Sequence, residues 1–565
     1  MKSDYKGLLA IVLSMGVLLV WYTWIAPTGQ APPKSAETPT TIAKTNTEAA
    51  TPTSATFNGV RPAGVRPAVT NDPQGVLSEK ATTIETEKVS ATFSNVGGVP
   101  THWALRKYLH RVDGADTPID IVGESVNAMT TAPLQVDFQS ANFSWPAMPR
   151  YQLTQSDKNT VVFTWRSKEL EVIKTFSLDP EGYGAQVMLS VKNLTNKSLT
   201  ATPVWHWQRE IPETSPKRGL FGFLKGPPDQ WHPVYLLNGK VVRQARITTT
   251  AQGSTKGEAE QNKVYWAGAE SRYFLAALVP QDEEDRQLQW GVNLKEGERN
   301  FYTALETQPI VVPAGGTWKY PMTLYAGPKE IDGLKKVGFR LDEAIDYGWF
   351  GLFAIPILHL LKFFYQILHN YGVAIILLTV LIKLLLYPIN KKSMASMKAM
   401  QTLQPKLKEL REKYANDKER INVETMNLFK LHKVNPMGGC LPMLAQFPIY
   451  IALYKVLWNA VELYQAPFFS FYHDLAAPDP YLVSPILLGI AMVLQQKLTP
   501  QTSIDPAQQK MMMMPLMFAG FMIFLPAGLT IYILVNTAMT IAQQWMSNKG
   551  IRLRDVVTGR AFARQ

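Results

Sequence analysis

Long apolar runs at the two ends of this 565-residue chain constrain its fold more than any other feature. The first run is Leu8–Ile25, and the later ones are Gly372–Tyr387, Gly438–Leu457, Tyr481–Gln496, Met511–Leu525 and Thr530–Met546. A helix of about 20 apolar residues crosses a bilayer. The pattern therefore predicts a multi-domain, multi-pass membrane protein with a large polar region after its first span.

The first apolar run is predicted to be a transmembrane anchor, residues 1–26. It ends with Trp21, Tyr22 and Trp24, and aromatic residues are typical of a membrane interface. A cleaved signal peptide is the alternative, although its apolar region is usually shorter, about 7–15 residues. Residues 27–56 are rich in Thr, Ala and Pro, which favours a flexible linker over 27–83.

Basic residues in the short loops predict the orientation, because cytoplasmic loops carry an excess of Lys and Arg. The connection 390–436 holds 11 Lys and Arg against 5 acidic residues, whereas 459–480 holds acidic residues but no Lys or Arg. Residues 1–7, 390–436, 497–510 and 547–565 together carry +12, the net charge of the whole chain. We expect both termini in the cytoplasm, residues 547–565 as a basic tail, and residues 27–370 in the periplasm.

The polar region has the texture of a β-domain, predicted over residues 84–340. Alternating or β-branched runs such as Thr160–Trp165, Leu170–Phe176 and Gln186–Val191 are separated by turn signals at 179–182, 238–239 and 314–316. Such runs are typical of antiparallel strands, and we expect a large sandwich. The single Cys in the chain excludes a disulfide scaffold and a Cys-based zinc site.

Three groups in this domain are candidates for sugar or peptide binding. They are Trp205-His206-Trp207, Trp231-His232 and the acidic run 282–285. No nucleophile–base pattern accompanies them, so packing against a sheet and a solvated turn are the favoured interpretations, and no catalytic residue is proposed.

Residues 341–370 predict an interfacial amphipathic helix. The polar residues His359, Lys362, Gln366 and His369 recur at helical spacing, which puts them on one face. A tilted transmembrane helix is the alternative.

Lys383 is the one ionisable residue well inside a predicted span. A charge at that depth is costly and indicates function, although a lysine five residues before Pro388 could instead extend to the inner head groups. Thr379 lies on the same helix face, and other spans contribute uncharged polar groups such as Gln446 and Asn536.

The basic hairpin 390–436 carries a Met-rich stripe, which suits varied apolar partners. Its basic face suits anionic lipid or ribosomal RNA. An ordinary hairpin core with a solvated face is the alternative.

Several ordered motifs resemble the YidC membrane protein insertase family in its Gram-negative form. They are Asn435-Pro436-Met437-Gly438-Gly439-Cys440-Leu441-Pro442, Gln446-Phe447-Pro448, Glu462-Leu463-Tyr464-Gln465-Ala466-Pro467-Phe468, Asp505-Pro506 and Phe524-Leu525-Pro526-Ala527-Gly528. The resemblance implies a five-span insertase core over 371–546, with a hydrophilic groove, beneath a periplasmic β-supersandwich related to galactose mutarotases.

The resemblance also implies site residues. Lys383 matches the groove's positive residue, which is commonly Arg, and Lys lacks the rigid fork of donors. Thr379 and Tyr532 match polar groove positions, while Ile533 replaces a second Tyr. Gln446 and Asn536, polar residues within other spans, are expected to line the same groove. The positions that match the substrate slide are Phe447, Tyr450, Met514 and Phe521.

We therefore expect a membrane protein insertase and chaperone of the bacterial inner membrane that is not an enzyme. It needs no cofactor, metal or small-molecule substrate. Its expected partners are nascent membrane proteins, the Sec translocon, the ribosome and membrane lipids. A secondary transporter with Lys383 as counter-ion is one alternative, but no inverted repeat is visible. A membrane-anchored sugar-processing enzyme is the other.

Overall fold

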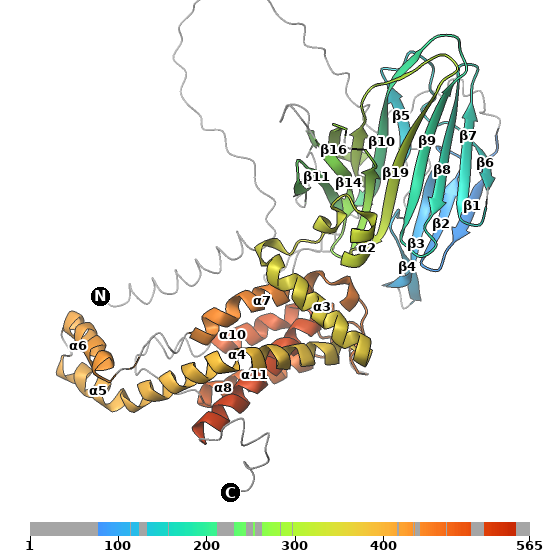
Figure 1. Ribbon diagram of the computed structural model, residues 1–565. Coiled ribbons are helices and arrows are strands. Elements are labelled where there is room, and N and C mark those ends of the chain that lie inside the picture. Colours follow the sequence, from blue (N-terminus) through green and yellow to red (C-terminus); the bar gives the residue numbers. More distant parts are fainter. Residues whose placement is uncertain are drawn as a thin grey trace, which may run out of the picture. The chain divides into compact units, whose positions relative to one another are not determined.

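The computed structural model describes residues 77–549, apart from 113–114, 124–132, 156, 212–230, 245–251, 255–262, 283, 296–297, 415–416, 433, 435–440, 470–471 and 499–513. The predicted anchor, most of the linker and the basic tail lie outside these residues. The described chain divides between Ala344 and Ile345 into a β-domain and a helical unit, and each is described separately (Figure 1).

The β-domain consists of antiparallel strands that form three sheets. The strands are β1 (Ala81–Glu85), β2 (Val89–Ser94), β3 (Val99–Val112), β4 (Ala115–Asp120), β5 (Gln135–Gln139), β6 (Gln152–Gln155), β7 (Thr160–Arg166), β8 (Leu170–Leu178), β9 (Gly184–Asn193), β10 (Leu199–Ile211), β11 (His232–Leu237), β12 (Lys240–Arg243), β13 (Gln252–Ser254), β14 (Val264–Glu270), β15 (Phe274–Pro280), β16 (Gln287–Lys295), β17 (Glu298–Glu306), β18 (Ile310–Val312) and β19 (Thr317–Pro328).

The three sheets differ in size. The largest has the order β12-β11-β14-β15-β19-β9-β8-β7-β6, the second β13-β16-β17-β10-β18 with β5 also paired to β10, and the third β1-β2-β3-β4. β19, near the end of the domain, pairs with both β9 and β15, and Figure 1 shows it beside β9. The core is aromatic, and its largest fully buried side chains include Trp103, Trp165, Trp205, Trp207 and Trp266.

The strands and turns named from the sequence are confirmed. β7, β8 and β9 contain the three predicted runs, and the buried residues of β8 alternate along the whole strand. Asn238 and Gly239 both have positive φ between β11 and β12, as a two-residue hairpin turn requires. A short helix, α2 (Ile331–Val337), follows the last strand, within the region predicted as β. The 3-10 turn η2 (Leu341–Ala344) comes next, at the start of the predicted amphipathic helix.

The second unit is helical. Its elements are η3 (Gly348–Phe350), α3 (Gly351–Leu368), α4 (Tyr371–Thr402), α5 (Gln404–Lys413), α6 (Lys418–Leu431), α7 (Leu441–Asn459), η5 (Val461–Leu463), α8 (Val483–Leu498), α10 (Met514–Phe521), η6 (Met522–Phe524) and α11 (Ala527–Asn548). The helices α4, α7, α8, α10 and α11 overlap the five predicted spans after residue 350. Their lengths are 32, 19, 16, 8 and 22 residues, respectively.

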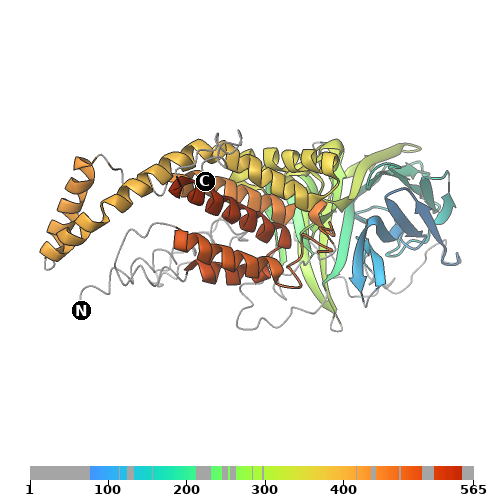
Figure 2. The same cartoon turned by 90° about the horizontal axis from the view of Figure 1, so that it is seen from below.

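Helix α4 is longer than the predicted span. It continues through Pro388 to Thr402, so the first part of the predicted hairpin is an extension of this helix. Figures 1 and 2 show α4 passing beyond the other long helices, with α5 and α6 at its far end. The hairpin proper is therefore formed by α5 and α6. Asp417 caps the start of α6, because its side chain accepts a hydrogen bond from the Arg420 amide.

Helix α3 has three faces rather than the two predicted. Ala354, Leu358 and Leu361 are buried, whereas His359 and Gln366 belong to the exposed polar face. A second apolar face is exposed and includes Leu352, Phe353, Phe363 and Ile367. By length and apolar composition alone, residues 348–368 and Tyr371–Thr402 are the two helices of the described chain that could each cross a membrane.

Candidate functional site

Lys383 lies in the middle of α4 with its side chain directed into the helical unit. It is 3% exposed, and its Nζ donates a hydrogen bond to Oγ1 of Thr540 on α11 over 2.9 Å. Within the described part of the chain, no carboxylate lies within ion-pair distance of this ammonium group. A buried lysine with one hydrogen bond has two further N–H donors for another acceptor.

Asn536 connects this lysine to α7. Its backbone carbonyl accepts a hydrogen bond from the Thr540 hydroxyl over 2.8 Å, and its Oδ1 accepts one from Gln446 Nε2 over 2.7 Å. Its Nδ2 donates to the hydroxyl of Tyr450. Five residues from three helices thus form one network, and we call Lys383, Gln446, Tyr450, Asn536 and Thr540 the polar cluster.

Two further predicted groove residues lie beside this cluster. Thr379 is buried one turn before Lys383 on α4, where its hydroxyl donates to the Ile375 carbonyl over 2.7 Å. The Tyr532 ring is buried and meets the Tyr450 ring edge to face, with 5.6 Å between centroids. The structure thus places Gln446 and Asn536 in one network with Lys383, and Tyr532 against Tyr450.

The residues matched to the substrate slide differ in their surroundings. Phe447 is 47% exposed on α7, while its neighbour Gln446 is buried in the polar cluster. Phe521, at the end of α10, is half-buried. Tyr450 belongs to the polar cluster through its hydroxyl, and the side chain of Met514 lies outside the described residues.

Sequence reasoning missed Thr540. It lies four residues after Asn536 and on the same helix face, so this spacing was the signal that could have identified it. Because its own proton is used on the Asn536 carbonyl, the lone pairs of its hydroxyl oxygen are free to accept from Lys383.

The connection between α7 and α8 covers the ends of two helices. The amides of Ala527 and Gly528, at the start of α11, donate to the carbonyls of Ala477 and Leu475 over 2.8 and 2.9 Å. Phe468 lies against Gly372, where an added Cβ would come within 2.0 Å of its ring. The glycine is therefore required for this loop to close over α4.

Asp479 organises the end of the same connection. Its carboxylate accepts hydrogen bonds from the Tyr472 hydroxyl, the Tyr481 amide, and both the amide and hydroxyl of Ser484. Burial raises the pKa of this carboxyl group, but these hydrogen bonds outweigh burial and leave the pKa below its ordinary value. The loop therefore has a fixed conformation at the start of α8.

Two ion pairs attach the α3 region to α7 and the turn that follows it. Lys362 Nζ lies 3.0 Å from Glu462 Oε1, and Lys455 Nζ lies 3.6 Å from Asp346 Oδ2. The Asn459 amide group also donates to the Asp346 carbonyl over 3.0 Å. One polar residue of α3 that was predicted to face the membrane interface, Lys362, therefore has a partner in the helical unit.

The aromatic and His candidates of the β-domain have structural roles. Trp205 and Trp207 are buried, and His206 Nε2 lies 3.7 Å from Asp137 Oδ2. Burial lowers the pKa of His206 although Asp137 opposes that shift. The Arg209 guanidinium lies over the Trp231 ring, with its Cζ 4.1 Å from the ring centroid. These groups pack and tie strands together.

Charged residues join the strands near the end of the domain. Glu270 is buried, with Arg243 Nε at 2.7 Å, Lys329 Nζ at 3.2 Å and His232 Nε2 at 3.3 Å. Burial alone would raise its pKa, but the three basic neighbours lower it well below the ordinary range. In the acidic run, Asp282 pairs with the buried Arg286, and Glu283 lies outside the described residues.

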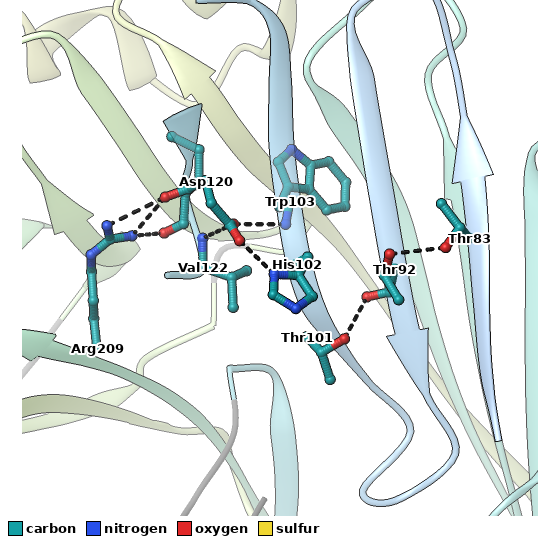
Figure 3. Close-up of polar contacts among 9 residues, drawn as sticks. Thr83, Thr92, Thr101, His102, Trp103, Asp120, Val122 and Arg209 are labelled. Carbon is teal, nitrogen blue, oxygen red and sulfur yellow. Dashed lines mark hydrogen bonds and ion pairs between the residues drawn. The ribbon is translucent and has the colours of Figure 1, made fainter. Parts of the chain in front are cut away.

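The His102–Asp120 pair in Figure 3 has the geometry of an oriented imidazole. Asp120 Oδ2 lies 2.7 Å from His102 Nδ1, while Oδ1 accepts from the amides of Trp103 and Val122. Arg209 binds the carbonyls of Asp120 and Ile121. The contacts fasten the end of β4 to β3 and β10.

The outer surface of the helical unit defines its class. Large apolar side chains are exposed along α8, namely Ile486, Leu487, Ile490, Val493 and Leu494, whereas the interior holds an ammonium group and amides. An apolar outer surface around a buried charge and buried amides is the pattern of a helical membrane protein with a functional interior. The whole chain is thus a membrane protein of the helical class, with antiparallel β-sheets preceding its helices.

Comparison with known proteins identifies the family. Residues 81–360 match the family model of the YidC periplasmic domain, and residues 363–554 match that of the 60Kd inner membrane protein. The curated membrane protein insertase YidC of Syntrophus aciditrophicus is 36% identical over 97% of this chain and 99% of its own length. Its namesake from Geotalea daltonii is 33% identical with the same coverage.

A solved structure of an active YidC insertase, with its first transmembrane domain resolved, is 18% identical. The match covers 83% of this chain and 93% of the chain in the solved structure, with a TM-score of 0.37. The nearly full-length matches to curated relatives show that this chain belongs to the YidC membrane protein insertase family. Membership confirms the predicted family and the prediction that the protein is not an enzyme. It excludes the two alternatives, a secondary transporter and a sugar-processing enzyme.

Proposed function

We propose that the polar cluster of this insertase receives polar and acidic parts of a membrane protein while its apolar segments pass into the inner membrane. Insertion as the function is supported by the curated relatives, which are named membrane protein insertases. The single observation that carries the role of the cluster is the buried ammonium of Lys383, which has one hydrogen bond and no carboxylate partner among the described residues.

The physical basis is a shortened apolar path. Moving a polar segment across about 30 Å of hydrocarbon is expensive because its polar groups lose their hydrogen bonds to water. Amides, hydroxyls and one ammonium at mid-span replace some of these bonds. Lys383 is almost fully buried, so a substrate carboxylate reaches it once neighbouring side chains have moved. Transfer of the apolar segments into lipid supplies the free energy.

In this proposal the substrate moves along the outer side of α7. Phe447 is exposed next to the buried Gln446, so an apolar segment at Phe447 has its polar neighbours within reach of the cluster. Phe521 and Met514 of α10 and Tyr450 complete the proposed slide, and Thr379 and Tyr532 complete the polar groove. The core is proposed to have five spans, with an additional N-terminal anchor at residues 1–26.

A photo-reactive residue at position 447 is expected to cross-link to an arrested nascent chain whose first apolar segment has left the ribosome. The matched control is position 490, because Ile490 is also an exposed apolar residue, but lies on α8, which carries no residue of the polar cluster. Equal cross-linking at the two positions would contradict a defined path at α7.

The proposed topology places the termini and the hairpin 390–436 in the cytoplasm, and residues 27–370 in the periplasm as a β-supersandwich with α3 at the membrane interface. The basic residues of 390–436 and 547–565 and the exposed apolar face of α3 support it. Both basic segments are also suited to ribosomal RNA, and we propose contacts with the ribosome and, for larger substrates, with the Sec translocon.

Labelling of single cysteines tests this topology in a Cys440→Ser background. A membrane-impermeant maleimide added to intact cells is expected to label Lys319→Cys in the β-domain within minutes. It is expected to label Lys408→Cys in α5 only after the membrane is opened. Both lysines are exposed, but the proposed topology puts them on opposite sides of the membrane. Labelling of Lys408→Cys in intact cells would reverse the orientation.

A further inference from the structure

The hydrogen bond that holds Lys383 depends on a hydroxyl group of α11. Thr540 Oγ1 accepts from Lys383 Nζ over 2.9 Å and donates to the Asn536 carbonyl, one turn earlier, over 2.8 Å. A threonine hydroxyl has one proton, and that proton is already committed to Asn536. The oxygen therefore presents lone pairs toward α4 in a fixed direction.

We propose that Thr540 is a positioning residue that keeps the Lys383 ammonium inside the bundle, ready for a carboxylate of the incoming chain. This inference rests on the proposed function of Lys383. The lysine stem is flexible, and Lys383 lies five residues before Pro388, near enough to extend toward the inner head groups. The Thr540 oxygen opposes that movement, because it gives the ammonium an acceptor at mid-span.

The arrangement also sets what the lysine offers to a substrate. An ammonium has three N–H donors, and Thr540 takes one of them. The other two remain for an acidic side chain. An arginine at this position would have a longer, planar group with five donors, so it would depend less on a single hydroxyl.

The same contact couples the lysine to the helix that meets the substrate. Asn536 accepts from Thr540 through its carbonyl, and its side chain bonds Gln446 and Tyr450 of α7. A shift of α7 as a substrate passes Phe447 is therefore transmitted to the acceptor that holds Lys383.

The test uses the full-length protein as the sole copy in cells depleted of their own insertase. Two substrates are compared: a two-span protein with one Asp in its translocated segment, and the same protein with Asn there. Thr540→Val, which keeps the side-chain shape but removes the hydroxyl, is expected to slow insertion of the Asp substrate about tenfold, as loss of a hydrogen bond to a charged group would. The Asn substrate should change less than twofold.

Three further variants separate positioning from packing. Thr540→Ser keeps the hydroxyl and should insert both substrates normally. Adding Lys383→Arg to Thr540→Val should restore the insertion rate of the Asp substrate. Thr537→Val, at a second buried threonine of α11, is the matched control and should have no selective effect. Membrane levels of each variant are measured alongside.

The outcomes distinguish this inference from the proposed function. If Thr540→Val affects the two substrates equally, or if arginine does not rescue it, the positioning role is wrong. If Lys383→Ala slows the Asp substrate while Thr540→Val does not, this inference fails and the role of Lys383 stands. If Lys383→Ala inserts the Asp substrate normally, both fail.

Discussion

Replacing Lys383 by alanine is expected to reduce insertion of a substrate with an acidic translocated segment by at least roughly tenfold. The estimate follows from a hydrogen bond to a charged group, which contributes about 1.5–3 kcal/mol, and from roughly 1.4 kcal/mol for each tenfold change in rate. Lys383→Arg should retain most of the activity, because it keeps the charge. Protease protection of the translocated loop in depleted cells measures the rate.

Lys497→Ala is the matched control, because Lys497 is a second lysine at a helix of the bundle but is exposed near the end of α8. It is expected to leave insertion unchanged. A substrate whose acidic residue is replaced by its amide should also respond little to Lys383→Ala. An equal loss with both substrates would indicate that Lys383 supports the fold rather than the substrate, and no loss would remove its proposed role.

The elements of the helical unit followed from the sequence wherever apolar runs had clear ends. The predicted spans 481–496 and 530–546 lie within α8 (Val483–Leu498) and α11 (Ala527–Asn548) to within a few residues, since their flanks carry Pro, Gly or basic residues. The end of α4 was not predictable in this way. Pro388 lies inside the helix, although a proline in a helix interior usually ends or kinks the helix.

The candidate site was only partly accessible to sequence reasoning. The depth of Lys383 within an apolar run identified it, and Gln446 and Asn536 stood out as polar residues within other apolar runs. Their direct contact joins residues 90 positions apart, and no local pattern encodes such a contact. Thr540 was not identified. A threonine in an apolar helix usually hydrogen-bonds its own backbone, and Thr540 makes that bond as well as accepting one from Lys383.

The three faces of α3 show a similar limit. Its polar residues recur at helical spacing and were grouped correctly, but the remaining residues are all apolar. Burial separates them into Leu358 and Leu361, which pack inside the helical unit, and Leu352 and Phe363, which are exposed. Periodicity alone cannot tell a face that meets protein from one that meets lipid, because both are apolar.

A buried lysine in the β-domain has consequences for its stability. Lys174 lies on β8 at a position where the alternation of buried residues points inward, so the period-two pattern contained the signal. It is fully buried, and Nζ donates to the carbonyls of Gly97, Gly98 and Leu134, each over 3.1 Å. Burial lowers the pKa of Lys174 from 10.5 to about 7.

The stability of the β-domain is therefore expected to rise with pH from about 7 to about 10.5, the folded and unfolded pKa values of Lys174. In that window the unfolded chain holds a proton on Lys174 that the folded chain has released, so the free energy of unfolding increases with pH. One proton gives a slope of at most about 1.4 kcal/mol per pH unit. Below pH 7 both states hold the proton and this contribution is constant.

Lys174→Met is expected to abolish this slope, because the methionine side chain binds no proton in either state. Hydrogen exchange of β8 amides in the full-length protein in detergent, corrected for intrinsic exchange rates at each pH, measures the free energy of opening. Lys192→Met, at an exposed lysine of the neighbouring strand β9, is the control and should keep the slope. If wild type and Lys174→Met show the same pH dependence, Lys174 does not change its protonation between the folded and unfolded states. The three carbonyls would then hold a permanently charged ammonium, since they accept all three of its N–H groups.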